Sequence, residues 1–570
     1  MLLYHLCIER FRGIQTLDWH VGGRIVCLVG PGDSTKTAVL DAIEIVLFPR
    51  PFFQFTDADF FNGDISNPLR IEATVGDLPP DLIKEEKFGL WKRGYDGQIR
   101  DEPLAGCQDV LTLRLTVDPN LEPTWEIIKD AMGEPKLISA KDREKLGMVR
   151  LGDEIERHLT WARGSALNRL TEDHDATGKM FVTAAREARK TVAAAELAEL
   201  NKAAKQASEA ASLFGANIGD TKAGLDPIAL SLGSSALGLQ TGAIPVRQYG
   251  LGTRRLAALA IQQQGAGKNQ ILLTDEIEHA LEPHRIRHLL KLFVTAGGAE
   301  ERSTGQVIFS THSPTPIMAL GASKLRIVRS TNGKTTITPV PTSLQAVVRS
   351  QSLAFLARKV IVCEGKTEEA VVRSLESVWG ERHQHKSYAL LGVVPVVSST
   401  GGGSNAHPAA QSLRSLNFNT ALFCDTDVAT TPSSAELRQN GVSVFEWDGK
   451  MSIEERIAQD LPLTDLQKLL MLVFETKDDD SKRSLLQSLA DRAKKPEAAT
   501  VGSNLQLWLQ GGLSEPDLRL ALGKCSKADG WFKNLNDGQL LGKVIGETLP
   551  KIPNSSLAKT LNGLEAWIYG

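Results

Sequence analysis

The sequence predicts an α/β protein that contains at least two domains. A chain of 570 residues is too long for a single hydrophobic core. Short apolar runs, typical of buried strands, occur at residues 25–29, 271–274, 306–310 and 325–328, with helix-like stretches between them. A second series begins at residue 359 with four runs: VIVCEG, VVPVVSST, ALFCDTD and VSVFEWD. Alternation of this kind indicates largely parallel sheets, whose sites lie at the carboxyl ends of the strands.

The composition is that of an ordinary globular protein, with 42% hydrophobic and 23% charged residues. A net charge of -3 gives no overall sign of nucleic-acid binding, although a basic groove and an acidic metal site can coexist in a near-neutral chain. The six cysteines form no CxxC pair, which argues against structural zinc and fits a reducing compartment. We find no signal-peptide pattern and no apolar run of about 18 residues, so we expect a cytoplasmic protein with no membrane partner.

One long helix is expected at residues 181–214. This stretch has no Gly or Pro, is rich in Ala, Glu, Lys and Arg, and is followed by Gly215. Two interpretations remain open: an exposed helical hairpin, or a helical insertion that pairs two subunits.

A phosphate-binding loop is expected at residues 30–37, GPGDSTKT, which follow a strand and open a helix. In such a loop backbone N–H groups surround the phosphates, Lys36 meets the β and γ oxygens, and the Thr37 hydroxyl binds Mg²⁺. Thr35 stands where a glycine usually precedes the lysine, which hinders close approach of the backbone. The candidate nucleotide-binding residues of the loop are Gly30, Gly32, Asp33, Ser34, Thr35, Lys36 and Thr37.

Three further segments support a nucleotide site. The apolar strand ILLT is followed by Asp275, placed to hold Mg²⁺ through water, and by Glu276, placed to orient the attacking water. His312 comes just after the next strand, where it can sense the γ-phosphate. Residues 250–255, GLGTRR, precede an apolar helix. Any one of these could be structural, but four segments in this order make a purely structural interpretation improbable.

This order resembles the ABC ATPases: phosphate loop, signature segment, acidic strand and switch histidine. Gly250 stands where the signature serine of those proteins reaches across a dimer, so that hydroxyl is missing. Together with Thr35, this departure is as consistent with a slow ATPase or a nucleotide sensor as with a motor. Because a partner's signature segment completes an ABC phosphate site, we expect a homodimer or a dimer of dimers.

Acidic residues follow two strands of the second half. Glu364 ends one strand and Glu368 follows it at a spacing of four, so both face one side of a helical turn. Asp425 and Asp427 follow another strand at a spacing of two. Carboxylates gathered at one sheet edge repel one another unless cations neutralise them, and oxygen ligands suit Mg²⁺ or Mn²⁺. Two such ions can promote phosphodiester hydrolysis.

The pattern EGxxE…DxD resembles the Toprim domain. An ABC ATPase directly followed by Toprim is the arrangement of the OLD (overcoming lysogenization defect) family of bacterial endonucleases, which includes the Gabija nuclease subunit. The resemblance covers essentially the whole chain. It implies an ABC-type ATPase domain at residues 1–345 with a helical dimerisation insert at about 151–225, then a Toprim domain with a helical C-terminal part at 346–570.

The resemblance also implies site residues. By this resemblance, the metal ligands are Glu364, Glu368, Asp425 and Asp427. A further acid for the second metal is expected in residues 448–455, where Glu454 is preferred over Glu455; a helix-start acid is the structural alternative. The GWFK segment implies that Lys533 steadies the scissile phosphate. For that segment, an aromatic anchor with a solvent-facing lysine is the open alternative.

We therefore expect a metal-dependent DNA endonuclease or nickase with a slow, regulatory ATPase that binds ATP with Mg²⁺. The family resemblance implies defence against phage and a helicase-like partner. Two alternatives remain: a nucleotide-switched DNA-binding repair or recombination ATPase without nuclease activity, and a nucleotide-switched assembly protein whose Toprim acids are structural remnants.

Overall fold

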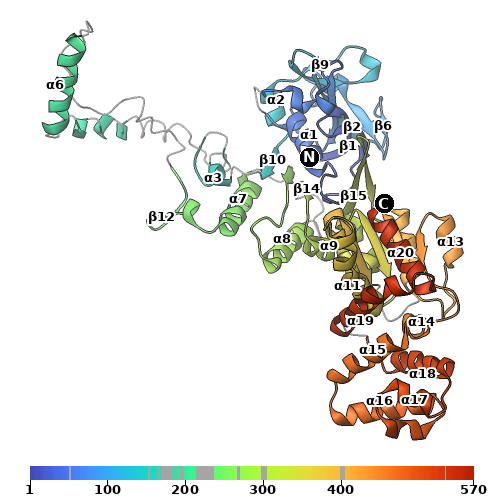
Figure 1. The fold of residues 1–570 in the computed structure, drawn as a ribbon. Helices are drawn as coiled ribbons and strands as arrows, with labels where there is room; N and C mark the ends of the chain where they lie inside the picture. Colours follow the sequence, from blue (N-terminus) through green and yellow to red (C-terminus); the bar gives the residue numbers. More distant parts are fainter. Residues whose placement is uncertain are drawn as a thin grey trace. The chain divides into compact units, whose positions relative to one another are not determined.

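The computed structural model describes residues 1–49, 53–151, 155–162, 165, 167, 183–184, 186–188, 190–192, 198–213, 237–265, 270–296, 305–397, 405–532 and 535–570. The chain divides into two compact units (Figure 1). Unit 1 comprises Met1–Val26 and Thr37–Ser310, and unit 2 comprises Cys27–Lys36 and Thr311–Gly570.

Unit 1 contains an antiparallel sheet in the order β2-β1-β4-β7, in which β7 also pairs with β5 and β8. The side chains of a strand point alternately to opposite faces. In β1, Leu6 and Ile8 are therefore fully buried, while His5 and Cys7 lie half-buried on the other face. The strands of this region are β1 (Leu2–Phe11), β2 (Ile14–His20), β4 (Leu69–Gly76), β5 (Arg93–Tyr95), β6 (Ile99–Arg100), β7 (Gln108–Val117), β8 (Pro123–Ile128) and β9 (Lys136–Leu137).

A parallel group of strands, β10-β13-β14, completes the main sheet structure of unit 1. All four residues of β13 are buried, as expected for an apolar strand covered on both faces. The remaining strands are β10 (Met148–Leu151), β11 (Gln240–Thr241), β12 (Ile244–Pro245), β13 (Ile271–Thr274) and β14 (Gln306–Ser310). The helices are α1 (Lys36–Leu47), α2 (Ala140–Glu144), α3 (Ile155–His158), α6 (Ala198–Leu213), α7 (Leu251–Gly265) and α8 (Pro283–Ala296).

Unit 2 contains two strand groups. In the first, β3 (Ile25–Val29) pairs in parallel with β15 (Leu325–Thr331), which pairs antiparallel with β16 (Lys334–Pro339). The second is a four-stranded, wholly parallel sheet in the order β18-β17-β19-β20. Its strands are β17 (Lys359–Cys363), β18 (Val393–Val397), β19 (Asn419–Phe423) and β20 (Ser443–Phe445). The mixed α/β class expected from the apolar runs is confirmed, because strands occupy all eight of the predicted runs.

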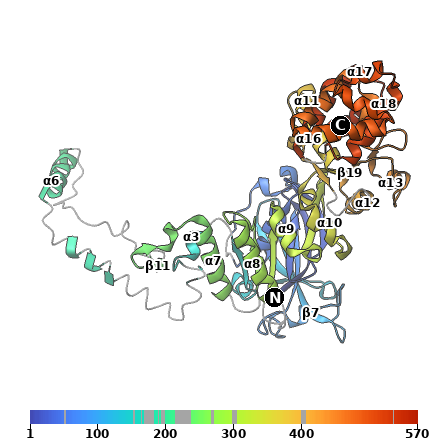
Figure 2. The same cartoon turned by 90° about the horizontal axis from the view of Figure 1, so that it is seen from below.

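Helices form the rest of unit 2, and Figures 1 and 2 both show α16, α17 and α18 grouped together. Helix α19 packs closely on α11, because Gly538, Gly542 and Gly546 lie at a spacing of four, and a Cβ at Gly542 would approach the Ser374 hydroxyl to 1.5 Å. The helices are α9 (Pro314–Leu320), α10 (Gln345–Ser350), α11 (Lys366–Arg382), α12 (Ala406–Ser415), α13 (Ser434–Gln439), α14 (Ile453–Asp460), α15 (Leu463–Glu475), α16 (Asp479–Arg492), α17 (Leu505–Gln510), α18 (Glu515–Ala528), α19 (Leu535–Thr548) and α20 (Ser556–Tyr569).

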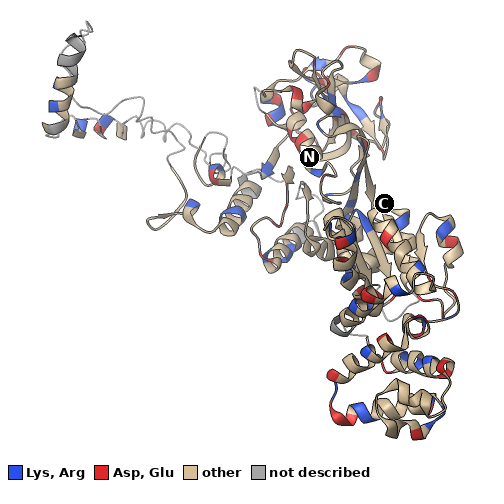
Figure 3. Cartoon of the chain, in the orientation of Figure 1, with Lys and Arg blue, Asp and Glu red and all other residues tan. Residues whose placement is uncertain are grey.

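The helix expected at residues 181–214 is described only in part. Ala198–Leu213 forms α6, as expected, and the other described residues of this stretch are helical. The remainder, and most of the insert expected at about 151–225, lies outside the described residues. Figure 3 shows basic and acidic residues interspersed on the helices of unit 2, in keeping with the net charge of -3. Among the described residues, no helix is long and apolar enough to cross a membrane.

Candidate active site

The parallel sheet of unit 2 brings the ends of β17, β19 and β20 to one edge. Cys363 is in register with Phe423, and Phe423 with Phe445. The residues that follow these strands therefore meet: the Glu364 N–H donates to the Phe423 carbonyl at 3.1 Å, and the Cys424 N–H to the Phe445 carbonyl at 3.3 Å. The sequence prediction that the acids following these strands share one edge rests on the same geometry.

Three predicted metal ligands lie together at this edge. One carboxylate oxygen each from Glu364, Asp425 and Asp427 lies within 4.8 Å of the other two. The Asp425 N–H donates to Glu364 Oε2 at 2.8 Å, and Asp425 Oδ1 accepts the N–H of Ile453, the first residue of α14, at 2.9 Å. The helix N-terminus thus supports the central aspartate. An all-oxygen donor set with this spacing fits Mg²⁺ or Mn²⁺.

Two further acids, Glu368 and Glu454, are buried, and their charges act on Asp425. Glu368, in the first turn of α11, accepts the Gly365 N–H at 2.8 Å and so caps its own helix. Glu454 Oε1 accepts a hydrogen bond from the Thr367 hydroxyl at 3.4 Å. Glu455 instead accepts the Ser452 N–H at 2.9 Å in a capping box. Of the two acids considered for the second metal, Glu454 lies toward the acidic group and Glu455 caps α14.

Burial and mutual repulsion raise the pKa values of three carboxyl groups in this cluster. The pKa of Asp425 is raised to about 10 by burial first and then by four carboxylates: Glu368, Glu364, Glu454 and Asp427. Burial, followed by the charge of Glu454, raises the pKa of Glu368 to about 8. Burial also raises the pKa of Glu364. Cations at the cluster would replace the protons and stabilise the ionised forms.

Lys527, near the end of α18, is a functional candidate that the sequence analysis missed. Its ammonium group forms an ion pair with Asp427. Burial alone would lower the pKa of Lys527, but the hydrogen bond and charge of Asp427, with the charges of Glu455 and Asp425, raise it. No motif distinguishes this lysine in the sequence. The predicted Lys533 lies outside the described residues, whereas Trp531 and Phe532 of the same segment are buried.

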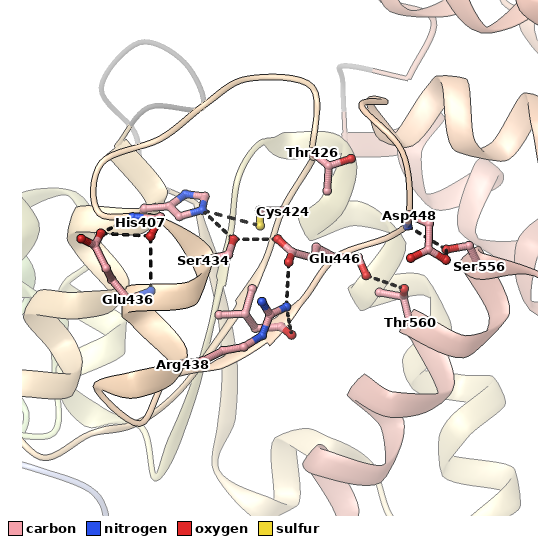
Figure 4. Close-up of polar contacts among 12 residues, drawn as sticks. His407, Cys424, Thr426, Ser434, Glu436, Arg438, Glu446, Asp448, Ser556 and Thr560 are labelled. Carbon is pink, nitrogen blue, oxygen red and sulfur yellow. Dashed lines mark hydrogen bonds and ion pairs between the residues drawn. The ribbon is translucent and has the colours of Figure 1, made fainter.

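A polar network supports the ends of β19 and β20 (Figure 4). The buried His407 Nε2 lies 4.0 Å from the Cys424 sulfur and 3.5 Å from the Ser434 hydroxyl. Ser434 donates to Glu446 at 2.6 Å, and Arg438 donates to the same carboxylate at 2.7 Å. Burial lowers the pKa of His407, against the raising charge of Glu446. The network therefore joins the Cys424 side chain, immediately before Asp425, to Ser434 of α13 and to Glu446, which follows β20.

The candidate phosphate loop lies mainly in unit 2. Asp33 and Thr35 adopt φ values of 58° and 67°, in the left-handed region that glycine tolerates best. The buried Lys36 ammonium donates to the loop itself, at 2.8 Å to the Pro31 carbonyl and 3.1 Å to the Gly30 carbonyl. Asp33 accepts a hydrogen bond from Arg358 at 3.1 Å. Of the remaining loop residues, Ser34 is buried and Gly32 and Thr37 are exposed; His312, also expected to serve nucleotide binding, is exposed too.

The acidic strand end in unit 1 is held by contacts of its own. The Ser310 hydroxyl donates to the Asp275 carboxylate, and the Glu276 N–H donates to Ser310 Oγ at 2.9 Å. Arg255 of α7 donates to the carbonyls of Asp275 and Glu276 at 2.8 and 2.9 Å. The Glu276 side chain is half-exposed. The sequence analysis did not single out Arg255, although it noted the segment containing it.

Gly252, in the signature segment, has a packing role within unit 1. A Cβ at this position would lie 2.4 Å from the carbonyl oxygen of Ala280, a clash with backbone that cannot shift cheaply. By contrast, nothing lies within 4 Å of a Cβ built on Gly250. Only the second glycine of this segment is therefore required by its surroundings.

The comparisons with known proteins define the class of each half. Residues 25–316, more than half of the chain, match the family model described as "AAA domain, putative AbiEii toxin, Type IV TA system", so the chain belongs to this family of AAA ATPase domains. Residues 355–427 match the model "Overcoming lysogenization defect protein-like, TOPRIM domain". The first match includes the phosphate loop, Asp275 and Glu276; the second includes both acid pairs.

An AAA ATPase domain followed by an OLD-like TOPRIM domain is the architecture of the OLD-family ATPase–Toprim nucleases, as the resemblance predicted. The domain pair indicates a nuclease with an associated ATPase. No curated protein matches the chain.

Among solved structures, the SMC head domain from Thermotoga maritima is 16% identical, covering 60% of this chain and 100% of that one with a TM-score of 0.29. An Smc head bound to the C-winged helix domain of ScpA is 15% identical, covering 60% of this chain and 98% of that one with a TM-score of 0.35.

Proposed function

We propose that the chain is a metal-dependent DNA endonuclease whose Toprim acids hydrolyse phosphodiester bonds and whose ATPase domain regulates cutting. The observation that carries the proposal is the group formed by Glu364, Asp425 and Asp427, with ligand oxygens within 4.8 Å of one another. The high pKa of Asp425 supports it, because a carboxylate this crowded is stabilised by cations. Bound Mg²⁺ or Mn²⁺ would supply an activated water and stabilise the leaving oxygen.

Each residue has a role in this proposal. Glu364, Asp425 and Asp427 hold the cations, and Glu368 and Glu454 complete the acidic site from behind. Helix α14 orients Asp425 through the Ile453 N–H.

Lys527 exchanges Asp427 for an oxygen of the scissile phosphate when cations occupy the cluster. Its side chain is 43% exposed and can reach solvent-borne DNA. Lys533, implied by the family resemblance, is the rival for the same task.

Nucleotide acts as a regulator rather than as fuel in this proposal. Thr35 and Asp33 impose left-handed backbone where glycine is preferred, and the Lys36 ammonium must leave the loop carbonyls to meet a phosphate. Both features slow turnover while leaving the Mg²⁺-ATP ligands Thr37 and Asp275 in the chain. Arg358, which binds Asp33, directly precedes β17, the strand that Glu364 follows. This ion pair joins the loop to the amino end of the strand whose carboxyl end leads into the acid cluster.

We further propose domain limits of 1–345 and 346–570, an ATPase-mediated homodimer or dimer of dimers, and a role in defence against phage. Light scattering with and without ATP tests the dimer. Plating efficiency of phage on cells that express the parent or the Asp425→Ala variant tests the biological role.

The test of the proposed activity uses supercoiled plasmid and purified protein with Mg²⁺, Mn²⁺ and ATP in all combinations. The proposal expects nicked or linear product only when a divalent cation is present. It also expects Lys36→Ala to make cutting insensitive to ATP, and Glu276→Gln to hold the ATP response in place. Cleavage that falls in proportion to ATP turnover in both variants contradicts regulation.

The alternative is a DNA-binding repair or recombination ATPase that does not cut. It is favoured if the parent binds DNA in an ATP-dependent way but leaves plasmid intact with every cation.

A further inference from the structure

Two histidines and an aspartate meet on the outer face of β1 and β2, in unit 1. His5 pairs directly with His20 across the antiparallel strands, and Asp18 lies two residues before His20 on the same face. Leu6, Leu17 and Trp19 alternate with them and are buried on the opposite face. The strand pairing therefore fixes all three side chains on one surface, although 13 residues separate His5 from Asp18 in the chain.

We propose that His5, Asp18 and His20 form a second metal site, which binds a transition ion of the Zn²⁺ class and is independent of the proposed nuclease site. One ligand atom from each of the three lies within 4.8 Å of the other two. His5 Nε2 is 2.6 Å from Asp18 Oδ1, and the two imidazole rings are 4.6 Å apart with an angle of 39° between their planes.

The three side chains are available to a cation. His5 is the only partner of the Asp18 carboxylate in an ion pair, and the His20 ring nitrogens have no hydrogen-bond partner, among the residues that the structure describes. The neighbouring acids of this face, unlike Asp18, are paired with arginines. Arg70 Nη1 lies 3.9 Å from Glu9 Oε2, and Arg114 Nη1 lies 3.7 Å from Glu72 Oε1.

The geometry suits a small tetrahedral ion. Zn²⁺ binds imidazole nitrogen and carboxylate oxygen at about 2.0–2.2 Å, which separates two ligand atoms by roughly 3.4 Å. The His5–Asp18 pair at 2.6 Å must open by less than 1 Å. Asp18 can rotate to do so, because its side chain is 76% exposed, and His20 is also exposed. Three protein ligands leave one coordination position for water.

The donor set separates this site from the acid cluster. Two imidazoles and one carboxylate favour Zn²⁺ or its neighbours in the first transition row, whereas Mg²⁺ prefers oxygen ligands alone. A bound ion would crosslink β1 and β2 and would stabilise unit 1 in proportion to the logarithm of its concentration over its dissociation constant.

The test measures Zn²⁺ binding to the full chain by calorimetry, with excess Mg²⁺ to occupy the acid cluster. The variants are His20→Asn and Asp18→Asn, with His385→Asn as the matched control because His385 is exposed and lies far along the chain. The parent and the control should bind one Zn²⁺ per chain more than the two variants do, or bind it at least about tenfold more tightly. Zn²⁺ should also raise the Tm of the parent and the control alone.

A second readout uses Co²⁺, whose visible absorption bands become stronger when the ion passes from six-coordinate in water to four-coordinate in a protein site. The bands should form with the parent and the control and be lost in both variants. Equal Zn²⁺ stoichiometry and affinity in the parent and the two variants, with equal Co²⁺ spectra, overturns the proposal and leaves His5 and Asp18 as an ordinary ion pair. Neither result depends on nuclease activity, so failure here is separate from failure of the proposed function.

Discussion

Replacing Asp425 with Asn tests the repulsion stored in the metal-free acid cluster. Asn keeps the shape and an oxygen that can accept the Ile453 N–H, but it carries no charge. In the parent, the folded state holds a proton on Asp425 up to about pH 10, whereas the unfolded chain releases it near the ordinary value of 3.8. The free energy of unfolding of the parent therefore falls as pH rises through this window. The free energy of unfolding of Asp425→Asn therefore equals that of the parent near pH 4 and exceeds it increasingly toward pH 8.

The size of this advantage follows from the shift. Buried carboxyl groups shift by about 3–5 pKa units, and each unit corresponds to about 1.36 kcal/mol. We therefore expect Asp425→Asn to raise the free energy of unfolding by on the order of 4 kcal/mol at pH 8 without metal. For a unit of this size, that is a rise in Tm of roughly 8–16 °C.

The assay is thermal unfolding in EDTA at pH 5 and pH 8, followed by tryptophan fluorescence. Asp480→Asn is the control, because the Asp480 side chain is 90% exposed. Added Mg²⁺ should stabilise the parent and the control but not Asp425→Asn, since the variant lacks the central ligand. The reasoning is refuted if Asp425→Asn is no more stable than the parent at pH 8 in EDTA, or if Mg²⁺ raises both Tm values equally.

Three further predictions concern Lys527 and the nucleotide site. Lys527→Ala should slow plasmid cleavage by roughly 10- to 1,000-fold, while calorimetry should show that Mg²⁺ binding is retained. If Lys527→Ala cuts like the parent and Lys533→Ala does not cut, Lys533 binds the scissile phosphate instead. Thr35→Gly should relieve left-handed strain of about 1–2 kcal/mol and increase ATP affinity or turnover by about tenfold, measured by phosphate release; slower turnover would contradict this. Arg255→Ala should lower stability by roughly 2–3 kcal/mol and reduce ATP hydrolysis, because carbonyls at the end of β13 lose their donor; a Tm equal to the parent's would contradict it.

The strands of the four-stranded parallel sheet could be predicted because their apolar character is local. The last four of the five residues of β19 are buried, and the run ALFCDTD already shows an apolar stretch ending in acids. The choice between Glu454 and Glu455 was also within reach of the sequence. Ser452 followed three residues later by Glu455 is a capping-box pattern, which assigns Glu455 to the helix end and leaves Glu454 for the cluster.

Other contacts depend on the tertiary fold and leave no trace in a local pattern. Lys527 reaches Asp427 from 100 residues away, and Arg358 reaches Asp33 from 325 residues away. The metal-ligand group of His5, Asp18 and His20 depends on strand register rather than on a spacing motif. Sequence reasoning therefore found the acids that follow strands and missed the cations that face them.

Cleavage of supercoiled plasmid by the Asp425→Ala variant is the most direct test of the acid cluster as the catalytic site. The assay runs in saturating Mn²⁺, beside the parent and Asp480→Asn, with binding of a fluorescent ATP analogue measured on the same samples. We predict that the parent and Asp480→Asn cut, that Asp425→Ala does not, and that all three bind the nucleotide equally. Full cleavage by Asp425→Ala would show that the cluster is not the nuclease site.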